Sequence, residues 1–158
     1  MGAGVLPMAI RDGKIYFLFS REYIHAKRDG GLWSDFGGRK DGDETFKETA
    51  IRECIEESSN ILGNDENIIG MVNNSLYQIT LDGYRSHVSF INYDENMVST
   101  FRQQFLSVKK ETPEKINKKG LYEKDMLRWI EYNDLKKNMH LFRPWYKKFI
   151  HHLSTLMT

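Results

Sequence analysis

The sequence is short of cysteine, proline and long apolar runs. Cys54 is the only cysteine among 158 residues, so no internal disulfide forms and a reducing compartment is expected. No apolar run approaches the roughly twenty residues that span a bilayer. Residues 1–10 lack the basic region and long apolar stretch of a signal peptide. We therefore expect a soluble cytoplasmic (intracellular) protein with no membrane partner.

The sequence also lacks a dominant charge and a cluster of soft metal ligands. The formal net charge is +1, which neither favours nor excludes a polyanionic ligand. The five histidines are scattered, which argues against zinc. With 40% hydrophobic and 28% charged residues, the composition is that of an ordinary globular protein. No repeat or linker divides the chain, so we expect residues 1–158 to form a single domain.

Turn signals and apolar periodicity predict a mixture of strands and helices. Strands are expected at residues 5–10, 14–20, 32–36, 76–81, 84–93 and 126–131, and the clearest helix at 43–60. Further helices are expected after Asp94, after Asp134 and from Pro144, with a loop at 109–119; the terminal helix would bury Trp145, Phe149, Leu153 and Leu156. Because strands and helices do not strictly alternate, we predict a mixed sheet covered by helices.

The helix at 43–60 carries an acidic cluster. Glu53, Glu56 and Glu57 fall within an arc of about 100° on one face, where the carboxylates repel one another. No lysine follows any of them by four residues to neutralise the charge. Mg²⁺ and Mn²⁺ prefer such oxygen ligands, so the cluster predicts a site for one of these ions.

Residues around the cluster fit the same interpretation. Arg52 lies four residues after Glu48 and four before Glu56, so it can pair with either carboxylate. Gly37-Gly38 permits a close backbone approach, which lets a carbonyl join the metal shell. Glu44, near the helix start, can accept hydrogen bonds from exposed amides.

This pattern resembles the Nudix box. The chain supplies Gly38, Glu44, Arg52, Glu53, Glu56 and Glu57 at the spacing of that motif. It departs at Ser59, where the box has glycine, at Asn60, where the box has an aliphatic residue, and at Cys54, a small substitute for another aliphatic residue. Residues 4–7, 33–38 and 127–130 also look like Nudix domains. The resemblance implies the α/β (α+β) class, as an α/β/α sandwich around a mixed β-sheet.

The resemblance further implies a metal-dependent pyrophosphohydrolase. Such enzymes hydrolyse a phosphoanhydride bond in a nucleoside diphosphate linked to another group. By this resemblance Glu56 and Glu57 are the principal ligands of Mg²⁺ (or Mn²⁺), together with the carbonyl of Gly37 or Gly38. Glu53 is a ligand or the general base, and Arg52 orients the carboxylates.

Residues elsewhere complete the expected site. Many family members use a further acidic residue from a later loop; Glu123 is the candidate and Asp125 its rival. Candidate phosphate ligands are Arg21, Lys27, Arg28, Arg39 and Lys40. Candidate residues for stacking on a base are Tyr23, Tyr77, Tyr84 and Phe90.

The substrate stays open between several classes. Tyr77 fits the marker of dinucleoside polyphosphate enzymes, whereas the proline that marks ADP-ribose enzymes is absent after the box. Capped RNA is an alternative substrate, and mRNA decapping the alternative activity, because Lys109-Lys110 and the lysines of residues 115–119 form a basic tract. A non-catalytic nucleotide-binding module is the remaining alternative. All box glutamates are present, which favours an enzyme; the sequence leaves the oligomeric state open.

Overall fold

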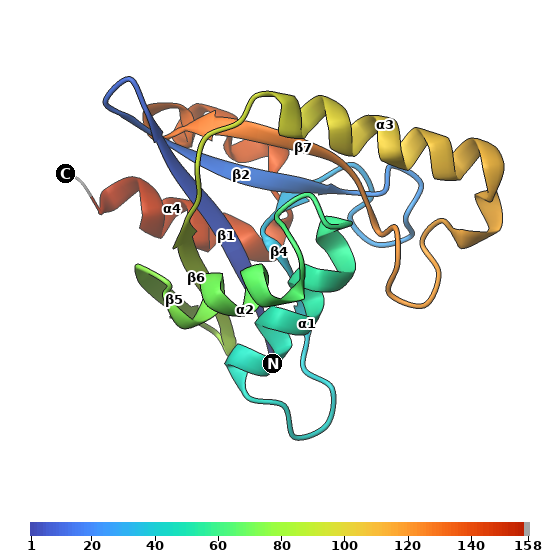
Figure 1. Ribbon diagram of the computed structural model, residues 1–158. Coiled ribbons are helices and arrows are strands. Elements are labelled where there is room, and N and C mark those ends of the chain that lie inside the picture. The colour runs from blue at the N-terminus through green and yellow to red at the C-terminus, as the bar shows by residue number, and fades with distance from the viewer. Residues whose placement is uncertain (157–158) are drawn as a thin grey trace.

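The computed structural model describes residues 1–156, and its centre is a mixed seven-stranded sheet (Figure 1). Both predicted hairpins are present, each closed by an Asp-Gly turn in which both residues have positive φ. The strands are β1 (Gly2–Arg11), β2 (Lys14–Glu22), β3 (Trp33–Ser34), β4 (Phe36–Arg39), β5 (Tyr77–Leu81), β6 (Tyr84–Phe90) and β7 (Lys124–Glu131).

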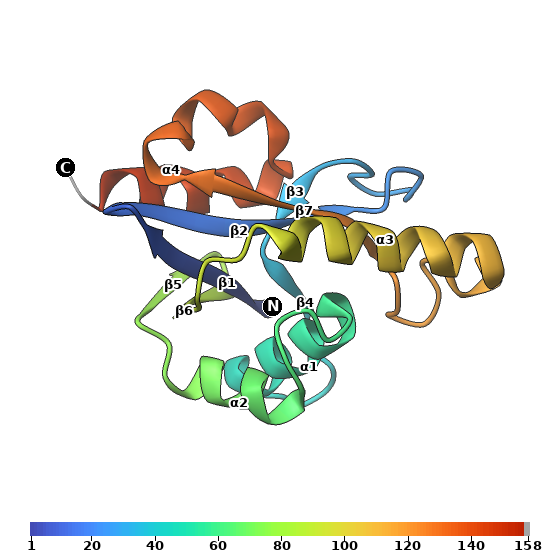
Figure 2. The ribbon, with the colours of Figure 1, turned by 45° about the horizontal axis from the view of Figure 1, so that its top comes forward.

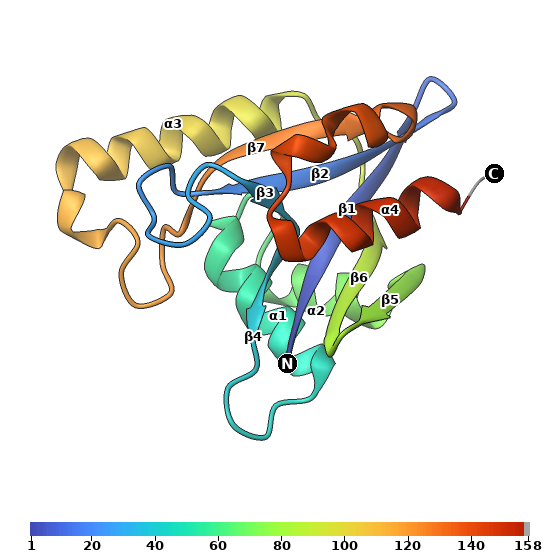
Figure 3. The same ribbon diagram turned by 180° about the vertical axis from the view of Figure 1, so that it is seen from behind.

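Strand β1 organises the sheet. Its second half pairs with β2 and its first half with β4, both antiparallel, while β6 runs parallel along its other edge. Strand β2 pairs with β3 and β7 beyond its pairing with β1. Strands β1 and β2 therefore diverge, and β4 lies beside the start of β1 (Figure 3). This divergence brings Gly37 and Gly38 of β4 next to the N-terminal end of the chain.

In the part of the chain that the structure describes, four α-helices and four short 3₁₀ helices surround the sheet. No helix within residues 1–156 is long and apolar enough to cross a lipid bilayer. The helices are α1 (Phe46–Ser58), α2 (Asp65–Asn73), α3 (Asn96–Glu111) and α4 (Lys147–Thr155), with 3₁₀ helices η1 (Pro113–Lys115), η2 (Tyr132–Asp134), η3 (Lys136–Leu141) and η4 (Pro144–Tyr146).

The side chains of β1 alternate between two cores, as a strand requires. Ala3 and Val5 pack in the core that α1, α2 and α3 cover, whereas Leu6 and Met8 belong to the core under α4. Figure 2 shows α4 on one side of the sheet and α1 and α2 on the other. The predicted α/β/α sandwich around a mixed sheet is therefore confirmed.

The first three helices differ from the prediction in their bounds or in their presence. Helix α1 begins at Phe46 rather than at residue 43, because Thr45 caps it in a capping box with Glu48. It ends at Ser58, since Ser59 adopts a left-handed conformation. Helix α2 was not expected. Helix α3 continues to Glu111, so the predicted loop at 109–119 starts only after it.

The C-terminal segment buries only part of the set of side chains that the sequence predicted. Pro144 opens the 3₁₀ turn η4, which runs directly into α4, and Phe149 and Leu153 are buried as predicted. Leu156 is 44% exposed, however, because α4 ends at Thr155 and its buried face consists of Phe149, Ile150 and Leu153. Trp145 is only half-buried and lines a cavity. Asp134 does not cap an α-helix; it ends η2, and η3 follows.

Candidate functional site

Arg52 connects the acidic face of α1 to the neighbouring backbone. Its Nε donates to Glu44 at 2.8 Å, its Nη1 to Glu53 at 2.9 Å and to Glu56 at 3.4 Å. Its Nη2 donates to the Arg39 carbonyl at 2.9 Å and to Glu44 at 3.0 Å. The planar guanidinium thus holds three carboxylates and β4 in one fixed arrangement. Of the two pairings predicted for Arg52, the one with Glu56 forms.

Glu44 serves this arrangement as an anchor. Besides Arg52, its carboxylate accepts from the Asp41 amide at 2.8 Å and the Thr49 hydroxyl at 3.0 Å. The hydrogen bonds from Arg52, above all, lower the pKa of Glu44 to about 2. Its oxygens are fully used within the protein, so Glu44 supports the site rather than offering a free ligand.

Glu57 is the most unusual carboxylate of the site. Its side chain is buried, and its Oε1 has no hydrogen-bond partner among residues 1–156. Burial raises the pKa of Glu57 well above its ordinary value, opposed by the positive charge of Lys124. An unpartnered buried carboxylate oxygen costs free energy, and a cation bound there would remove that cost.

Glu53 lies directly against the backbone of β4. A Cβ built on Gly38 would meet its carboxylate at 2.5–2.7 Å, so any side chain at that position would displace the Glu53 carboxylate. Burial raises the pKa of Glu53 to about 7, although Arg52 opposes the shift. The absence of a side chain at residue 38 is therefore a steric requirement of the site.

The two candidates for an additional carboxylate have different environments. Burial raises the pKa of Glu123, and the negative charges of Glu22 and Glu56 add to the shift, which places Glu123 near the cluster. Asp125 instead pairs with Arg21 at 2.7 Å and accepts from the Ile24 amide at 2.8 Å. The structure therefore favours Glu123 over Asp125.

The carboxylates gather but do not form a ready-made cage. Among residues 1–156, no three acidic, histidine or cysteine side chains converge closely enough to hold a cation. Arg52 accounts for this in part, because its Nη1 contacts Glu53 and Glu56 together.

The backbone of β4 distinguishes its two candidate carbonyls. The Gly38 carbonyl points to β1, where it would contact a Cβ on Gly2. Successive carbonyls of a strand point to opposite edges, so those of Gly37 and Arg39 face away from β1. Arg52 donates to the Arg39 carbonyl, which confirms that this edge faces the α1 side chains. Gly37 is therefore the carbonyl better placed for a metal.

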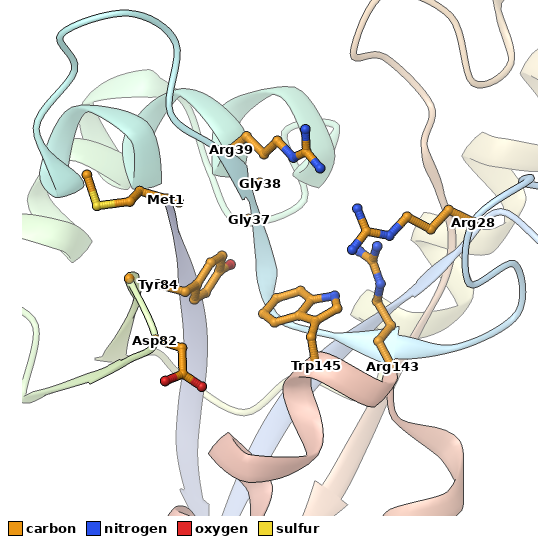
Figure 4. A pocket seen from close by; sticks show the side chains of 11 residues that line it. Met1, Arg28, Gly37, Gly38, Arg39, Asp82, Tyr84, Arg143 and Trp145 are labelled. Atoms are coloured by element: carbon orange, nitrogen blue, oxygen red, sulfur yellow. The ribbon is translucent and has the colours of Figure 1, made fainter.

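A cavity of about 210 Å³ adjoins Gly37 and Gly38 (Figure 4). Trp145 and Tyr84 form its aromatic wall, with ring centroids 4.7 Å apart. The cavity is also lined by Arg28, Arg39 and Arg143, whose side chains are labelled in Figure 4. Positive charge and aromatic surface in one concave site suit a nucleotide.

A buried network fixes the aromatic wall. The Tyr84 hydroxyl and the Ser86 hydroxyl each donate to Asp35 at 2.7 Å. Burial raises the pKa of Asp35 to about 6. The Tyr84 hydroxyl also packs so closely on Gly4 and Gly37 that neither position has room for a Cβ. This network holds the cavity wall and the β4 backbone together.

A second network adds a buried positive charge. Lys124 is 1% exposed, and its Nζ donates to Glu22 at 2.8 Å and to the Ser34 hydroxyl at 3.2 Å. Arg143 contacts the same Glu22 oxygen at 2.9 Å. Sequence reasoning missed Lys124, Glu22 and Arg143, because no local spacing connects them to the acidic helix.

Other predicted binding residues divide into two groups. Arg28, Arg39 and Tyr84 line the cavity, as a substrate-binding role requires. The other six do not. Arg21 is paired with Asp125, Lys40 lies over the Phe46 ring, and Tyr77 lies on edge strand β5 beside His152. Tyr77 is a correction, because its strand is at the sheet edge, away from α1. Lys27 and Phe90 are exposed outside the cavity, and Tyr23 packs on Phe105.

Comparisons with solved structures agree on the fold. A binary complex of the Ap4A hydrolase of C. elegans has a TM-score of 0.57 at 15% identity, covering 99% of this chain and 96% of that one. The MutT protein of Methanosarcina mazei has a TM-score of 0.53 at 18% identity over 96% and 90% of the two chains. The Nudix domain of Shewanella oneidensis NrtR, complexed with ADP ribose, gives 0.55 at 12% over 99% and 87%. At these identities the likeness shows the fold alone.

Sequence comparison adds a relative and a family. An uncharacterized protein of Acanthamoeba polyphaga mimivirus, L534, is 44% identical over 59 residues, which are 36% of this chain and only 19% of that protein. The model of the NUDIX domain family matches residues 1–153, nearly the whole chain. The expected activity, hydrolysis of phosphorus-containing anhydrides, stays a prediction for this chain. On this match, with the box residues assembled as described, the chain belongs to the Nudix family.

Proposed function

We propose that this protein hydrolyses a phosphoanhydride bond in a nucleoside diphosphate linked to another group, such as a dinucleoside polyphosphate. The observation that carries the proposal is the buried, unpartnered carboxylate oxygen of Glu57 on α1, the helix whose Glu53 abuts Gly38 in the wall of a cavity of arginines and aromatic rings. An orphaned acidic oxygen suits a cation, and the cavity suits the nucleotide whose phosphates that cation would meet.

The donor chemistry of the residues present suits a divalent cation, although their side chains do not converge on one point. Glu56, Glu57 and the Gly37 carbonyl would hold it, with Glu123 as a further ligand, and all of these donors are the oxygens that Mg²⁺ and Mn²⁺ prefer. When bound, the cation would neutralise charge on the phosphoryl oxygens and lower the pKa of an attacking water.

The protein's own side chains supply the remaining steps. Glu53, with its pKa raised to about 7, is suited to accept the proton of the attacking water as general base. Arg52 positions Glu53 through their 2.9 Å hydrogen bond. In the cavity, Trp145 and Tyr84 would stack on the base, while Arg28 and Arg39 would bind phosphates.

The proposal is tested by phosphate release from a nucleotide panel with Mg²⁺, with Mn²⁺ and with a chelator. The panel contains dinucleoside polyphosphates, ADP-ribose, nucleotide sugars and nucleoside triphosphates. We expect turnover that requires the metal and that falls by orders of magnitude in Glu57→Gln. Glu66→Gln, an exposed glutamate of α2, is the matched control and should leave turnover unchanged.

Two results would contradict the proposal. Wild-type turnover in a folded Glu57→Gln variant would remove Glu57 from the site. Nucleotide binding without hydrolysis of any panel member, at saturating metal, would support the non-catalytic nucleotide-binding module instead. Melting curves of both variants, measured without metal, establish whether the fold is intact.

A further inference from the structure

The loop between β2 and β3 brings a positive charge to the cavity. It spans residues 23–32, and Arg28 near its tip lines the cavity wall (Figure 4). Within residues 1–156, neither Arg28 nor Arg39 forms an ion pair, whereas Arg143, the third arginine of the wall, is paired with carboxylates. The position of the loop therefore determines how much unpaired positive charge reaches a phosphate bound in the cavity.

Arg143 is fixed by the elements around it. Its amide donates to the Trp33 carbonyl at 2.9 Å. Its Nη1 donates to Glu22 at 2.9 Å, and the same Glu22 oxygen accepts from Lys124 at 2.8 Å. Its guanidinium carbon lies 5.3 Å from the centroid of the Trp145 ring. Arg143 can therefore serve as a rigid attachment point beside the aromatic wall of the cavity.

The tip of the loop is attached to the rest of the protein through Asp29. The Arg143 Nε donates to the Asp29 carboxylate at 3.0 Å, and the two side chains are only 13% and 20% exposed. Within residues 1–156, no other residue of the tip, residues 25–30, forms a hydrogen bond or ion pair outside the loop. The base of the loop is secured separately, because the amides of residues 23–24 donate to residues 123–125.

The internal shape of the loop does not depend on this ion pair. The Ala26 amide donates to the Tyr23 carbonyl at 2.8 Å, and the Leu32 amide donates to the Asp29 carbonyl at 3.0 Å. Gly30 packs so closely that a Cβ there would lie 2.7 Å from the Ala26 carbonyl. Because these contacts all lie within the loop, they fix its shape but not the distance between its tip and the cavity.

We propose that Asp29 and Arg143 are positioning residues, whose ion pair holds the loop so that Arg28 faces the phosphates of a bound nucleotide. The inference rests on the proposed function and adds to it two residues that determine substrate affinity. Within residues 1–156, neither residue forms a hydrogen bond or ion pair with a carboxylate of α1. The pair therefore acts on nucleotide binding rather than on the hydrolytic step.

The variant that tests the inference is Asp29→Asn. Asp29 has a left-handed backbone with φ 55°, which asparagine tolerates, so the substitution removes the charge and keeps the turn. The matched control is Asp12→Asn. Asp12 also has a left-handed backbone, with φ 51°, and also pairs with an arginine, Arg11, but it lies at the β1–β2 turn and does not line the cavity. Arg28→Ala removes the positioned group itself.

We expect Asp29→Asn to raise the KM for diadenosine tetraphosphate about tenfold at saturating Mg²⁺ and to leave kcat nearly unchanged. The factor is that of losing one charge-assisted hydrogen bond to a phosphate. Charge alone predicts the opposite sign, because removal of an anion beside a cationic cavity favours the binding of phosphate. Asp12→Asn should have the KM and kcat of wild type.

A double variant distinguishes positioning from general damage to the cavity. Arg28→Ala should raise KM by a similar factor, and adding Asp29→Asn to it should change KM little further, because Asp29 acts through Arg28. Hydrogen exchange without ligand supplies a readout independent of turnover. The amides of residues 25–30 should exchange faster in Asp29→Asn than in wild type or in Asp12→Asn.

The failure of this inference is distinguishable from the failure of the proposed function. If no nucleotide is hydrolysed, the proposed function fails, and the affinity for ADP, measured by calorimetry, tests the positioning role in place of KM. An affinity about tenfold weaker in Asp29→Asn supports that role. Unchanged exchange at residues 25–30, unchanged or tighter nucleotide binding in Asp29→Asn, or additive effects of the two substitutions would each overturn it.

Discussion

At the scale of single residues, Arg52 determines how the acidic face of α1 is presented. Its three nitrogens are all occupied, by two glutamates of α1, by Glu44 and by a β4 carbonyl. A lysine has one ammonium group and could not maintain this fork. The positive charge of Arg52 therefore reduces the repulsion between the Glu53 and Glu56 carboxylates. Its hydrogen bond also fixes the direction in which the Glu53 side chain points.

Gly38→Ala is predicted to damage catalysis more than stability. The new methyl group would lie 2.5–2.7 Å from the carboxylate of Glu53, which must then move. Displacement of a catalytic group by about 1 Å costs on the order of a hundredfold in rate. We expect kcat to fall by about that factor, measured by phosphate release, while overpacking lowers the free energy of unfolding by about 1–3 kcal/mol.

Gly70→Ala is the control for this substitution. Gly70 lies in α2, and a Cβ there would meet no atom within 4 Å. Alanine should therefore leave kcat unchanged and should stabilise the helix by about 0.5–1 kcal/mol. Unchanged kcat in Gly38→Ala would contradict the close packing of Glu53 on β4.

The box residues could be predicted from sequence because they share one helix and the strand before it. Glu53, Glu56 and Glu57 are brought together by helical periodicity alone. Trp145 and Arg143, by contrast, reach the cavity only through the packing of the C-terminal segment on the sheet. No spacing in the sequence connects residues 143–145 with residues 37–38, so this half of the site required the structure.

At the scale of elements, the end of α1 retains a conformational cost. Ser59 has φ 49° and ψ 41°, the left-handed conformation that glycine adopts without penalty. We predict that Ser59→Gly raises the free energy of unfolding by about 1 kcal/mol. For a chain of this size that corresponds to an increase in Tm of about 2–4 °C, measurable by calorimetry.

Ser59→Ala is the comparison that isolates the backbone effect. It removes the hydroxyl but keeps the Cβ, so the left-handed cost remains and Tm should not rise. If Ser59→Gly were no more stable than Ser59→Ala, the departure from glycine at this position would carry no strain. Activity should be retained in both variants, because no carboxylate moves.

Helix α2 shows where sequence patterns were insufficient. Its capping box joins Asn64 and Asn67 through their side chains, whereas the usual signature has glutamate or glutamine at the second position. Only Ile68 and Val72 of its nine residues are buried, too few for a clear periodicity. The strong elements, both hairpins and α1, had a clear turn sequence or a long apolar face and were predicted correctly in type.

At the scale of the whole molecule, the junction of β1 and β6 makes stability depend on pH. His87 of β6 is 1% exposed, and its Nδ1 lies 3.2 Å from the Gly4 carbonyl of β1. Burial lowers the pKa of His87, and the positive charges of Arg85 and Lys47 add to the shift. The folded protein thus keeps His87 neutral at pH values where the unfolded chain already binds a proton.

The sign of the effect follows from this difference in bound protons. Below the ordinary histidine pKa of about 6.5, unfolding takes up a proton at His87, so acid favours the unfolded state. The contribution of neutral His87 is complete above that pH and is lost as the pH falls toward the lowered pKa. A single group contributes a slope of at most about 1.4 kcal/mol per pH unit.

We predict that His87→Asn reduces this slope. The asparagine amide can still donate to the Gly4 carbonyl but does not titrate. Urea unfolding of the metal-free protein between pH 5 and pH 8 should show wild type losing stability more steeply than the variant below pH 6.5. His151→Asn, at an exposed position of α4, should follow wild type throughout. Parallel curves for wild type and His87→Asn would mean that His87 takes up its proton equally in both states, and that its burial between the strands does not penalise the charged ring.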